Sequence, residues 1–238
     1  MIYIGYDPRE CEAFEVCAFS IKDRSSLPVR RLYTKDMPEY KRDTGEPQST
    51  DFTFSRFFVP YLSNYEGYSI FVDCDFLFLA DPQALIDMAM SDPSKAVWVC
   101  KHPRYIPNSV SKMDNIAQNQ YDKKNWASLM VFNNAHPDCR ALNLHTLNDH
   151  VPGMDFHQFN WTTEENIGSI PLEWNCLDGY YHLENPKAIH YTDGGPWFED
   201  YQDTFYSDYW IKEFKIMNNS LTEQEKFDRM YINSGVMW

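Results

Sequence analysis

The sequence predicts an α/β protein in which a mixed, mainly parallel sheet is flanked by helices. Short apolar runs of strand type alternate along the chain with segments of helical periodicity. Such alternation is typical of α/β proteins, whose strands are mostly parallel. The 238 residues are 43% hydrophobic and 16% aromatic. This content is sufficient for one substantial core, so a single domain is the simplest expectation.

The N-terminal part of the chain contributes two strands and a helix. A strand pattern covers residues 2–6, and the letters Asp7-Pro8-Arg9-Glu10 follow it. Because Asp can cap a helix, Pro fits the first helical position and Glu10 can complete a capping box, we expect a helix to about residue 21. A second strand is expected over residues 29–33. Residues 34–50 are polar, with two prolines and a glycine, and predict a loop.

The middle of the chain continues the alternation. Residues 52–62 have helical periodicity, residues 68–72 are a strand pattern, and Asp81-Pro82 indicates the start of a helix to about residue 90. A further strand is expected over residues 95–100. Residues 102–124 are polar with scattered prolines and little periodicity. They predict a long loop, and long loops in compact domains are often functional.

The last part of the chain contains two more strands and several helices. Strands are expected at residues 128–132 and 187–190, and a helix at residues 137–147. Further helices are expected from Phe205 and from the capping box Thr222-x-x-Glu225. We expect residues 1–198 to form the main domain and residues 199–238 a helical extension packed on it.

Charge and cysteine content exclude some classes of function. The formal charge of -14 and the pI of about 4.8 argue against a protein that binds nucleic acid or an anionic membrane. No apolar run reaches the length of a membrane span, and the chain starts on a strand pattern instead of a signal peptide, so we expect a cytosolic protein. The six cysteines form no CxxC pair and are expected to be reduced thiols that pack in the core.

The most informative segment is Ser69-Ile-Phe-Val-Asp-Cys-Asp-Phe-Leu-Phe-Leu79. An apolar run here brings two carboxylates, Asp73 and Asp75, to the point where a strand leaves the sheet. Residues two apart in a strand face the same side, so both carboxylates can reach one cation while Cys74 points away. Hard oxygen ligands suit Mg²⁺ or Mn²⁺, which commonly bridge a protein to a substrate diphosphate. A strand that ends in acidic turn residues is the alternative interpretation.

A histidine adds a third ligand type. His190 ends an apolar strand, and Gly194 and Gly195 follow it, where backbone N–H groups can approach an anion closely. Together with Asp73 and Asp75, His190 completes the ligand set of a manganese site. A histidine at the end of a strand is otherwise often structural.

Several motifs occur in an order that resembles the retaining glycosyltransferases of family eight, the group of glycogenin and the bacterial galactosyltransferases. In chain order they are Gly5-Tyr6-Asp7, Ser55-Arg56, the Asp-Cys-Asp segment, Ala127-Ser128, residues 155–160, Trp174-Asn175 and His190-Tyr191. The resemblance spans about residues 2–198 and depends on the order of the motifs more than on any single one. It implies a GT-A fold, which is Rossmann-like, and a nucleotide-diphosphate-sugar donor.

The resemblance also implies roles for individual residues. The implied metal ligands are Asp73, Asp75 and His190, the implied contacts to base and ribose are Gly5, Tyr6 and Asp7, and the implied residues beside the donor sugar and acceptor are Arg56, Asp155 and Gln158. His157 is an alternative to Gln158, and Tyr6 can instead be ordinary packing. Phenylalanines surround Arg56 in the sequence, so an inward guanidinium needs a carboxylate or phosphate partner.

One departure from the family affects the diphosphate. Members of the family follow the metal histidine with HxxGxxKPW, whose lysine pairs with the diphosphate. This chain is one residue shorter there and has no lysine between His190 and Trp197. Phosphate neutralisation must therefore come from other groups. The candidates are the Gly194 and Gly195 amides, Lys101 and Arg104.

The resemblance implies transfer of a hexose to an acceptor hydroxyl with retention at the anomeric carbon. UDP-glucose or UDP-galactose is the favoured donor, and GDP-mannose is the alternative. The departing phosphate oxygen can take the proton of the acceptor, so no pair of catalytic carboxylates is required. The acceptor, whether glycan, protein or lipid-linked, is not identified, and residues 199–238 can pack on the core, contact a partner or form a homodimer.

Two other functions compete with this interpretation. Phosphatases of the haloacid dehalogenase type also place DxD after an apolar strand, but their motif normally continues into Gly-Thr, whereas this one continues into Phe76 and Leu77. A non-catalytic sugar-binding protein is the second competitor, because 7 Trp, 16 Tyr and 16 Phe can supply stacking surfaces.

Overall fold

A mixed sheet of six strands forms the centre of the protein. The computed structural model describes residues 1–43, 45, 48–103, 111–112, 116–117, 122–149, 151–222 and 224–225. In spatial order the strands are β2 (Val29–Leu32), β1 (Ile2–Gly5), β3 (Tyr68–Val72), β8 (Leu129–Asn133), β5 (Val97–Cys100) and β9 (Ile167–Ile170). β1 is parallel to β2 and β3, β5 is parallel to β9, and β8 is antiparallel to β3 and β5. The predicted fold class is confirmed.

A second, smaller sheet lies next to the first. Its strands, in spatial order, are β10 (Cys176–Leu177), β11 (Ala188–His190) and β4 (Phe76–Phe78). β11 runs antiparallel to β4 and parallel to β10. β3 and β4 are separated by only residues 73–75, so the chain passes directly from the large sheet to the small one at the Asp-Cys-Asp segment.

The predicted loop at residues 102–124 is described only in part. It includes a two-stranded antiparallel pair, β6 (Ser111–Lys112) and β7 (Ile116–Ala117). Arg104, which the sequence offered as a phosphate-binding residue, lies outside the described residues.

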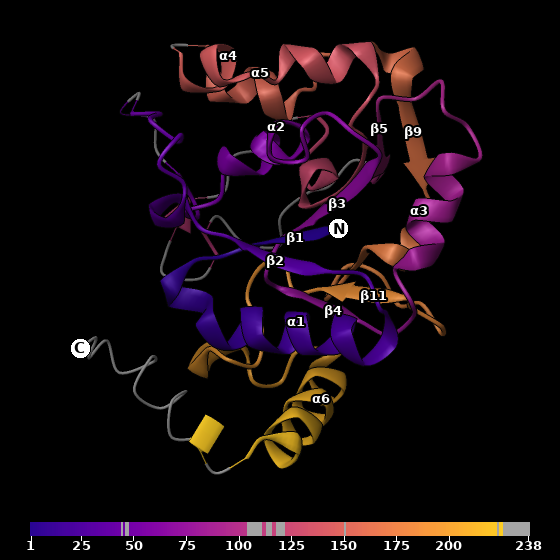
Figure 1. Cartoon of the computed structure of the whole chain (residues 1–238). Helices are drawn as coiled ribbons and strands as arrows, with labels where there is room; N and C mark the ends of the chain where they lie inside the picture. The colour runs from indigo at the N-terminus through magenta and orange to yellow at the C-terminus, as the bar shows by residue number, and fades with distance from the viewer. Residues whose placement is uncertain are drawn as a thin grey trace.

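Helices cover both ends of the sheets. The α-helices are α1 (Cys11–Arg24), α2 (Val59–Leu62), α3 (Gln83–Met90), α4 (Leu144–Asn148), α5 (Gly153–His157) and α6 (Ser207–Ser220). The 3₁₀ helices are η1 (Pro8–Glu10), η2 (Thr34–Asp36), η3 (Ser55–Phe58), η5 (Trp126–Ser128), η6 (Pro137–Ala141), η7 (Glu164–Asn166), η8 (Leu172–Trp174) and η9 (Glu199–Tyr201). Figure 1 shows α1 between the strands and α6, with α4 and α5 at the opposite end of the molecule.

The first predicted helix begins where its sequence indicates. The Asp7 side chain accepts a hydrogen bond from the Arg9 amide at 2.9 Å and caps η1, with Pro8 in the first position. α1 continues from η1 without a break. The capping box predicted near the C-terminus is formed, because the Thr222 amide and hydroxyl donate to Glu225 at 2.8 and 2.7 Å.

Two predicted helices have a different form. Residues 52–62 form turns, then η3 and the single turn of α2, and the four phenylalanines of this segment are all buried. Residues 137–147 divide into η6 and α4. The division occurs at Asn143, whose side chain accepts from the amides of His145 and Thr146 and starts the second helix.

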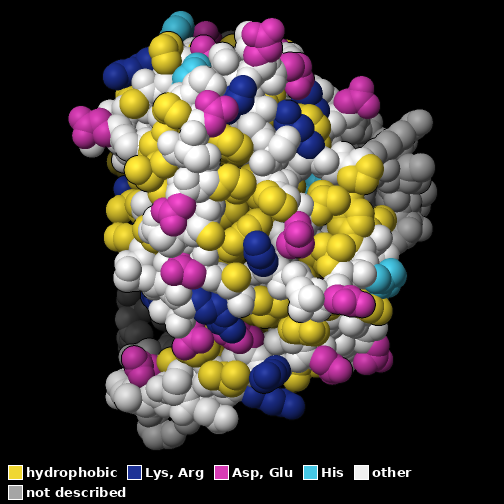
Figure 2. Space-filling model, turned by 90° about the vertical axis from the view of Figure 1, so that its right-hand side faces the viewer, with side chains coloured by type: hydrophobic (Ala, Val, Ile, Leu, Met, Phe, Trp, Pro, Cys, Tyr) yellow, Lys and Arg dark blue, Asp and Glu magenta, His cyan; other side chains and the backbone are white. Residues whose placement is uncertain are grey.

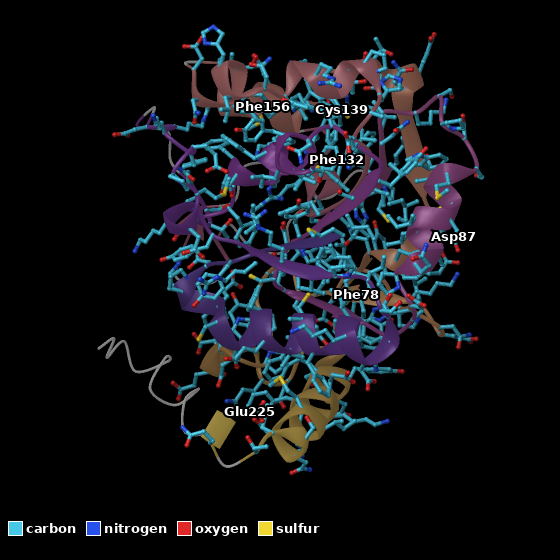
Figure 3. The ribbon with its side chains drawn as sticks, in the orientation of Figure 1. Phe78, Asp87, Phe132, Cys139, Phe156 and Glu225 are labelled. Carbon is cyan, nitrogen blue, oxygen red and sulfur yellow. The ribbon has the colours of Figure 1, made fainter. Side chains whose placement is uncertain are left out.

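The core has two parts. The larger one fills the space around the main sheet, and Figure 3 labels Phe132, Cys139 and Phe156 in its upper region and Phe78 beside α1. The smaller one lies between α1, the small sheet and α6. Its buried members are Val16, Leu77, Cys176, Ile189, Tyr191, Tyr206, Trp210 and Met217. α6 is further tied to α1 by Arg24, which donates to Glu213 at 2.6 and 3.0 Å. The first residues after 198 therefore pack on the rest of the chain.

The surface and the cysteines are consistent with the composition. On the face drawn in Figure 2, basic side chains lie in small separate groups among acidic and apolar ones. All six cysteines fall within the described residues and are free, and five of them are buried, as expected for packed thiols. Within the described part of the chain, no helix has the length and apolar character needed to cross a membrane.

Candidate metal and donor site

The two sheets bring three predicted ligands together. Asp73 and Asp75 lie between β3 and β4, and His190 is the last residue of β11. The antiparallel register pairs His190 with Phe76, which places the imidazole next to Asp75. His190 Nε2 lies 3.3 Å from Asp75 Oδ2, and one ligand atom of each of the three residues lies within 4.8 Å of the others. This arrangement can hold a divalent cation.

A turn orients the two aspartates, and the predicted alternation along one strand is wrong. Residues 73–75 form a turn between two sheets, not the end of one strand, so strand alternation does not orient them. Cys74 does point away, as predicted. Its buried Sγ donates to Glu10 Oε2 at 3.7 Å, while the side chains of Asp73 and Asp75 keep 15% and 12% exposure. Anchoring of Cys74 in the core therefore presents both carboxylates on the open side of the turn.

Arg56 balances one of the two carboxylates. Its Nη1 donates to the Ala127 carbonyl and pairs with Asp73 Oδ1, both at 2.9 Å. The guanidinium also lies over the rings of Phe52 and Phe71, at 5.3 and 5.0 Å. Arg56 is only 6% exposed, so its guanidinium points inward. Asp73 is the carboxylate partner that the sequence required of such a guanidinium. A cation–π environment and an ion pair together fix this charge.

The region around the ligands is electronegative. The pKa of the Cys17 thiol lies well above its ordinary value, first because of burial and then because of the carboxylates of Asp75 and Asp73. Burial raises the pKa of Cys74 in the same way, with Glu10 and the two aspartates adding to the effect. Both thiols therefore stay protonated, and the carboxylates attract a cation.

His102 is a second buried histidine near the site. Its ring stacks on Tyr181 with centroids 5.8 Å apart, and its Nδ1 lies 3.3 Å from the Tyr181 hydroxyl. Burial, and next the positive charge that His190 can carry, lower the pKa of His102 to about 3. It is therefore neutral at physiological pH. No motif in the sequence indicated a role for this residue.

The predicted nucleotide-binding residues lie at the end of β1. Asp7 is buried, and its oxygens accept from Arg9 Nε and Nη2 at 3.0 and 2.7 Å and from the Asp51 amide at 3.1 Å. Burial alone would raise the pKa of Asp7, but these hydrogen bonds lower it overall. Tyr6 packs edge-on against Phe14 and Tyr33. Gly5 is needed for close packing, because a Cβ there would lie 2.5 Å from the Phe52 ring.

The predicted phosphate-binding glycines follow His190. Gly194 has φ +124°, which favours glycine, and its amide donates to the Tyr191 carbonyl at 2.9 Å. A phosphate would have to compete with that carbonyl for the amide. At Gly195, a Cβ would collide with the Trp197 ring. Local structure thus favours glycine at both positions. The contact of these glycines with a diphosphate stays a prediction.

Lys101 lies beside a half-buried tryptophan. Its Nζ donates to the Ile167 carbonyl at 2.8 Å and lies 5.8 Å from the centre of the Trp126 ring. Lys123 lies over the same ring at 5.6 Å. Trp126 belongs to η5, whose Ala127 carbonyl binds Arg56. Lys101 is therefore connected to Arg56 through η5.

Asp155 lies on α5 and Gln158 directly follows it. Asp155 Oδ1 accepts from Asn160 Nδ2 at 3.0 Å, and the Gln158 carbonyl accepts from Lys123 at 2.9 Å. Between them, the ring of His157 packs edge-on against Phe57 of η3, the element that carries Arg56. This contact connects α5 to the site through η3, without placing Asp155 or Gln158 at the ligand cluster.

Comparison with known proteins identifies a relative. No family model matches the chain. Protein CDI of Arabidopsis thaliana is 41% identical over 228 residues, which cover 91% of this chain and 86% of that protein. The chain belongs to the protein CDI family.

Solved glycosyltransferases share the fold of this CDI-family chain. The bifunctional glycosyltransferase WbbM superposes with a TM-score of 0.64 at 16% identity over 98% of the chain. GlyE of Streptococcus pneumoniae TIGR4 gives 0.58 at 15% over 92%, and the galactosyltransferase LgtC, in complex with donor and acceptor sugar analogs, gives 0.58 at 10% over 94%. The chain spans 51% of WbbM, 61% of GlyE and 98% of LgtC. It has the GT-A fold that the resemblance implied.

The CDI-family chain also contains site residues without a role in the sequence analysis. Asn175 Oδ1 lies 2.9 Å from His190 Nδ1, and Asn175 Nδ2 donates to Ser128 Oγ at 2.9 Å. The Phe76 ring stacks on the imidazole of His190. Trp174-Asn175 and Ala127-Ser128 were motifs of the resemblance, so a signal existed. It carried no information on which atoms meet.

Proposed function

We propose that this chain is a metal-dependent retaining glycosyltransferase that moves a hexose from a nucleotide-diphosphate sugar to an acceptor hydroxyl. The observation that carries the proposal is the cluster of Asp73, Asp75 and His190, with ligand atoms within 4.8 Å of one another, in a fold shared with glycosyltransferases. The donor and acceptor sugar analogs in the LgtC complex support a nucleotide-sugar donor for this chain as well.

The residues of the cluster suit Mn²⁺ or Mg²⁺. Asp75 Oδ1 is buried and has no hydrogen-bond partner among the described residues. A buried carboxylate oxygen without a partner is costly, and a cation would relieve that cost. Two carboxylates and one imidazole match the preferences of Mn²⁺ and, less closely, Mg²⁺. A bound cation would supply positive charge to the diphosphate as the nucleotide leaves.

The chain's own residues hold this arrangement in place. Arg56 binds Asp73 Oδ1 and so orients that carboxylate, and the guanidinium itself is held in place by burial. The β4–β11 pairing keeps His190 beside Asp75. Because these groups are fixed before substrate arrives, little reorganisation is needed when charge develops on the leaving group.

The remaining predicted residues complete the proposal. The proposed contacts to base and ribose are Gly5, Tyr6 and Asp7, those to the diphosphate are Gly194, Gly195 and Lys101, and those to sugar and acceptor are Arg56, Asp155 and Gln158. UDP-glucose or UDP-galactose is the proposed donor. The acceptor is a glycan, a protein or a lipid-linked molecule, and a homodimer is compatible with the proposal. The free cysteines support a cytosolic location, because reduced thiols persist there.

The test is release of nucleotide diphosphate from a panel of UDP- and GDP-sugars, with Mn²⁺, Mg²⁺ or a chelator. Slow hydrolysis of the donor requires no knowledge of the acceptor. We expect turnover of UDP-glucose or UDP-galactose that depends on the metal, and a loss of at least about 100-fold in Asp75→Asn, because a ligand is removed.

Asp87→Asn is the matched control, because Asp87 is an exposed carboxylate on α3 (Figure 3). It should leave turnover unchanged. If the wild-type protein turns over no donor and binds no nucleotide in a metal-dependent way, the proposal is wrong.

A further inference from the structure

His190 is fixed from three sides in the candidate metal site. The Phe76 ring stacks on the imidazole, with centroids 4.4 Å apart and planes 18° apart. Asp75 Oδ2 lies 3.3 Å from Nε2, and Asn175 Oδ1 lies 2.9 Å from Nδ1. His190 and Asn175 are 2% and 0% exposed. Bulk water is therefore excluded from the Nδ1 side, and the protein alone determines the hydrogen bond there.

The hydrogen bonds beyond Asn175 have a defined direction. Ser128 Oγ donates to the backbone carbonyl of Asn125 at 2.7 Å, and a carbonyl oxygen can only accept. The single hydroxyl proton of Ser128 is used in this bond. Ser128 Oγ must therefore accept from Asn175, and the atom of Asn175 that faces it, 2.9 Å away, is the amide nitrogen Nδ2. The carbonyl oxygen of Asn175 then faces His190.

This direction determines where the proton of His190 resides. Both groups that face the ring only accept: Asn175 Oδ1 lies 2.9 Å from Nδ1, and Asp75 Oδ2 lies 3.3 Å from Nε2. Because the contact with Asn175 is the shorter one and is a hydrogen bond, Nδ1 of the neutral imidazole carries the proton and Nε2 keeps its lone pair. Nε2 is the nitrogen that faces Asp75. We infer that the chain of hydrogen bonds from Asn125 through Ser128 and Asn175 fixes this tautomer of His190 before a metal binds. Asn175 and Ser128 are thus positioning residues for a metal ligand.

Ser128 acts on a second ligand as well. Its backbone carbonyl accepts from the Asp73 amide at 2.9 Å. One residue therefore holds the backbone of Asp73 and, through Asn175, the ring of His190. Asn125, the origin of the chain, has φ 65°, a left-handed conformation that asparagine tolerates, and its carbonyl accepts the Ser128 hydroxyl from there. Partners of this kind typically contribute about 10–100-fold to metal affinity.

The inference rests on the proposed function, because the fixed tautomer serves a purpose only if the three ligands hold a cation. The test measures Mn²⁺ binding to the full chain by calorimetry. In Asn175→Leu, which removes the acceptor, we expect Mn²⁺ affinity to fall by about 10–100-fold. Asn175→Asp keeps an acceptor for the Nδ1 proton and should retain binding. Ser128→Ala should lose less than Asn175→Leu, because Asn175 can still adopt the required orientation.

The chain contains a matched control pair. Asn134 is 0% exposed and donates from Nδ2 to Ser69 Oγ at 2.9 Å, the same contact that joins Asn175 to Ser128. Ser69 pairs with Phe132 at the other end of the β3–β8 ladder, whereas the site lies at the Val72–Leu129 end. Asn134→Leu and Ser69→Ala should lower the melting temperature without changing Mn²⁺ affinity. This comparison separates loss of a ligand's partner from general destabilisation.

A second measurement reports the tautomer directly. In metal-free protein with ¹⁵N-labelled histidine, long-range ¹H–¹⁵N spectra should assign the proton of His190 to Nδ1 in the wild type, and the Nε2–H form should appear in Ser128→Ala. Wild-type Nε2–H, or Mn²⁺ affinity in Asn175→Leu equal to that of the wild type, would overturn the inference. A wild-type protein that binds no Mn²⁺ at all would instead contradict the proposed metal site on which the inference depends.

Discussion

At the scale of single residues, the sequence reveals the chemistry that a side chain can perform, but not which residues surround that side chain in the fold. Asp73, Asp75 and His190 were predictable, because carboxylates and a histidine at strand ends limit the chemistry to a few types. The pairing of Arg56 with a carboxylate was predictable in kind, although its partner Asp73 was not named. The role of Asn175 was not, because it depends on contacts 15 and 47 residues away in the sequence.

Arg56 gives a prediction that separates stability from metal binding. In Arg56→Met, the nearly buried Asp73 loses its ion-pair partner, and the free energy of unfolding without metal should fall by about 3 kcal/mol. A bound cation can compensate the unpaired carboxylate. The increase in melting temperature on adding Mn²⁺ should therefore be larger in this variant than in the wild type. Thermal unfolding with and without Mn²⁺ measures both effects.

Arg42→Met is the matched control. Arg42 is 5% exposed and also lies over two phenylalanine rings, Phe54 and Phe156. It donates to the carbonyls of Leu147, Asp149 and Val151, far along the chain from the ligands. This variant should lose stability with an unchanged Mn²⁺ effect. Equal Mn²⁺ effects in Arg56→Met and the wild type would contradict the role assigned to Arg56.

At the scale of elements, predictions succeeded where the local pattern decides and failed where tertiary contacts decide. β1, β3, β5 and β8 are apolar runs of four or five residues, and each was expected. β9 was missed, because Ile-Gly-Ser-Ile has no strand signal of its own and is a strand only by pairing with β5. β4 was missed because the turn at residues 73–75 interrupts what reads as one apolar run. Residues 52–62 have helical periodicity but form turns and two short helices, and periodicity alone could not reveal this difference.

α6 supports the segment that follows His190. Trp210 of α6 packs against Trp197 with ring centroids 5.5 Å apart, and Tyr191 donates to the Tyr206 carbonyl at 2.9 Å. Trp210→Ala should lower the free energy of unfolding by about 3 kcal/mol and increase hydrogen exchange of amides in residues 191–198.

Ile216→Ala is the comparison on the same helix. Ile216 is 45% exposed, so its truncation should change stability by no more than about 0.5 kcal/mol. Unchanged exchange of residues 191–198 in Trp210→Ala would show that the segment does not depend on α6.

At the scale of the whole molecule, a half-buried histidine with both ring nitrogens shielded from solvent adds an acid-sensitive contribution to stability. His157 packs against Phe54 and Phe57, and burial, followed by the positive charge of Arg56, lowers its pKa to about 3. In the unfolded chain its pKa is about 6.5, so between these values the unfolded state binds more protons. The contribution of neutral His157 to the free energy of unfolding is therefore fully present above about pH 6.5, and it is lost as pH falls toward 3.

His157→Phe should make stability less dependent on pH. Between pH 7 and pH 5, we expect the variant to lose about 1–2 kcal/mol less unfolding free energy than the wild type, because one proton no longer binds on unfolding. Urea unfolding at the two pH values measures the difference. His145→Gln, at a side chain that is 88% exposed, should leave the wild-type dependence unchanged. Parallel pH profiles for His157→Phe and the wild type would contradict the assignment.

The chain crosses from the large sheet to the small one between β3 and β4. The position of His190 relative to Asp75 therefore depends on the register in which β11 pairs with β4. His190 reaches Asp75 because β11 pairs with β4 in one frame, with His190 opposite Phe76. A shift of one position would present Ile189 or Tyr191 there instead, and the side-chain faces of the strand would be reversed. A single-residue insertion or deletion between 177 and 188 that changed this frame would therefore remove the third ligand while leaving every ligand residue in the sequence.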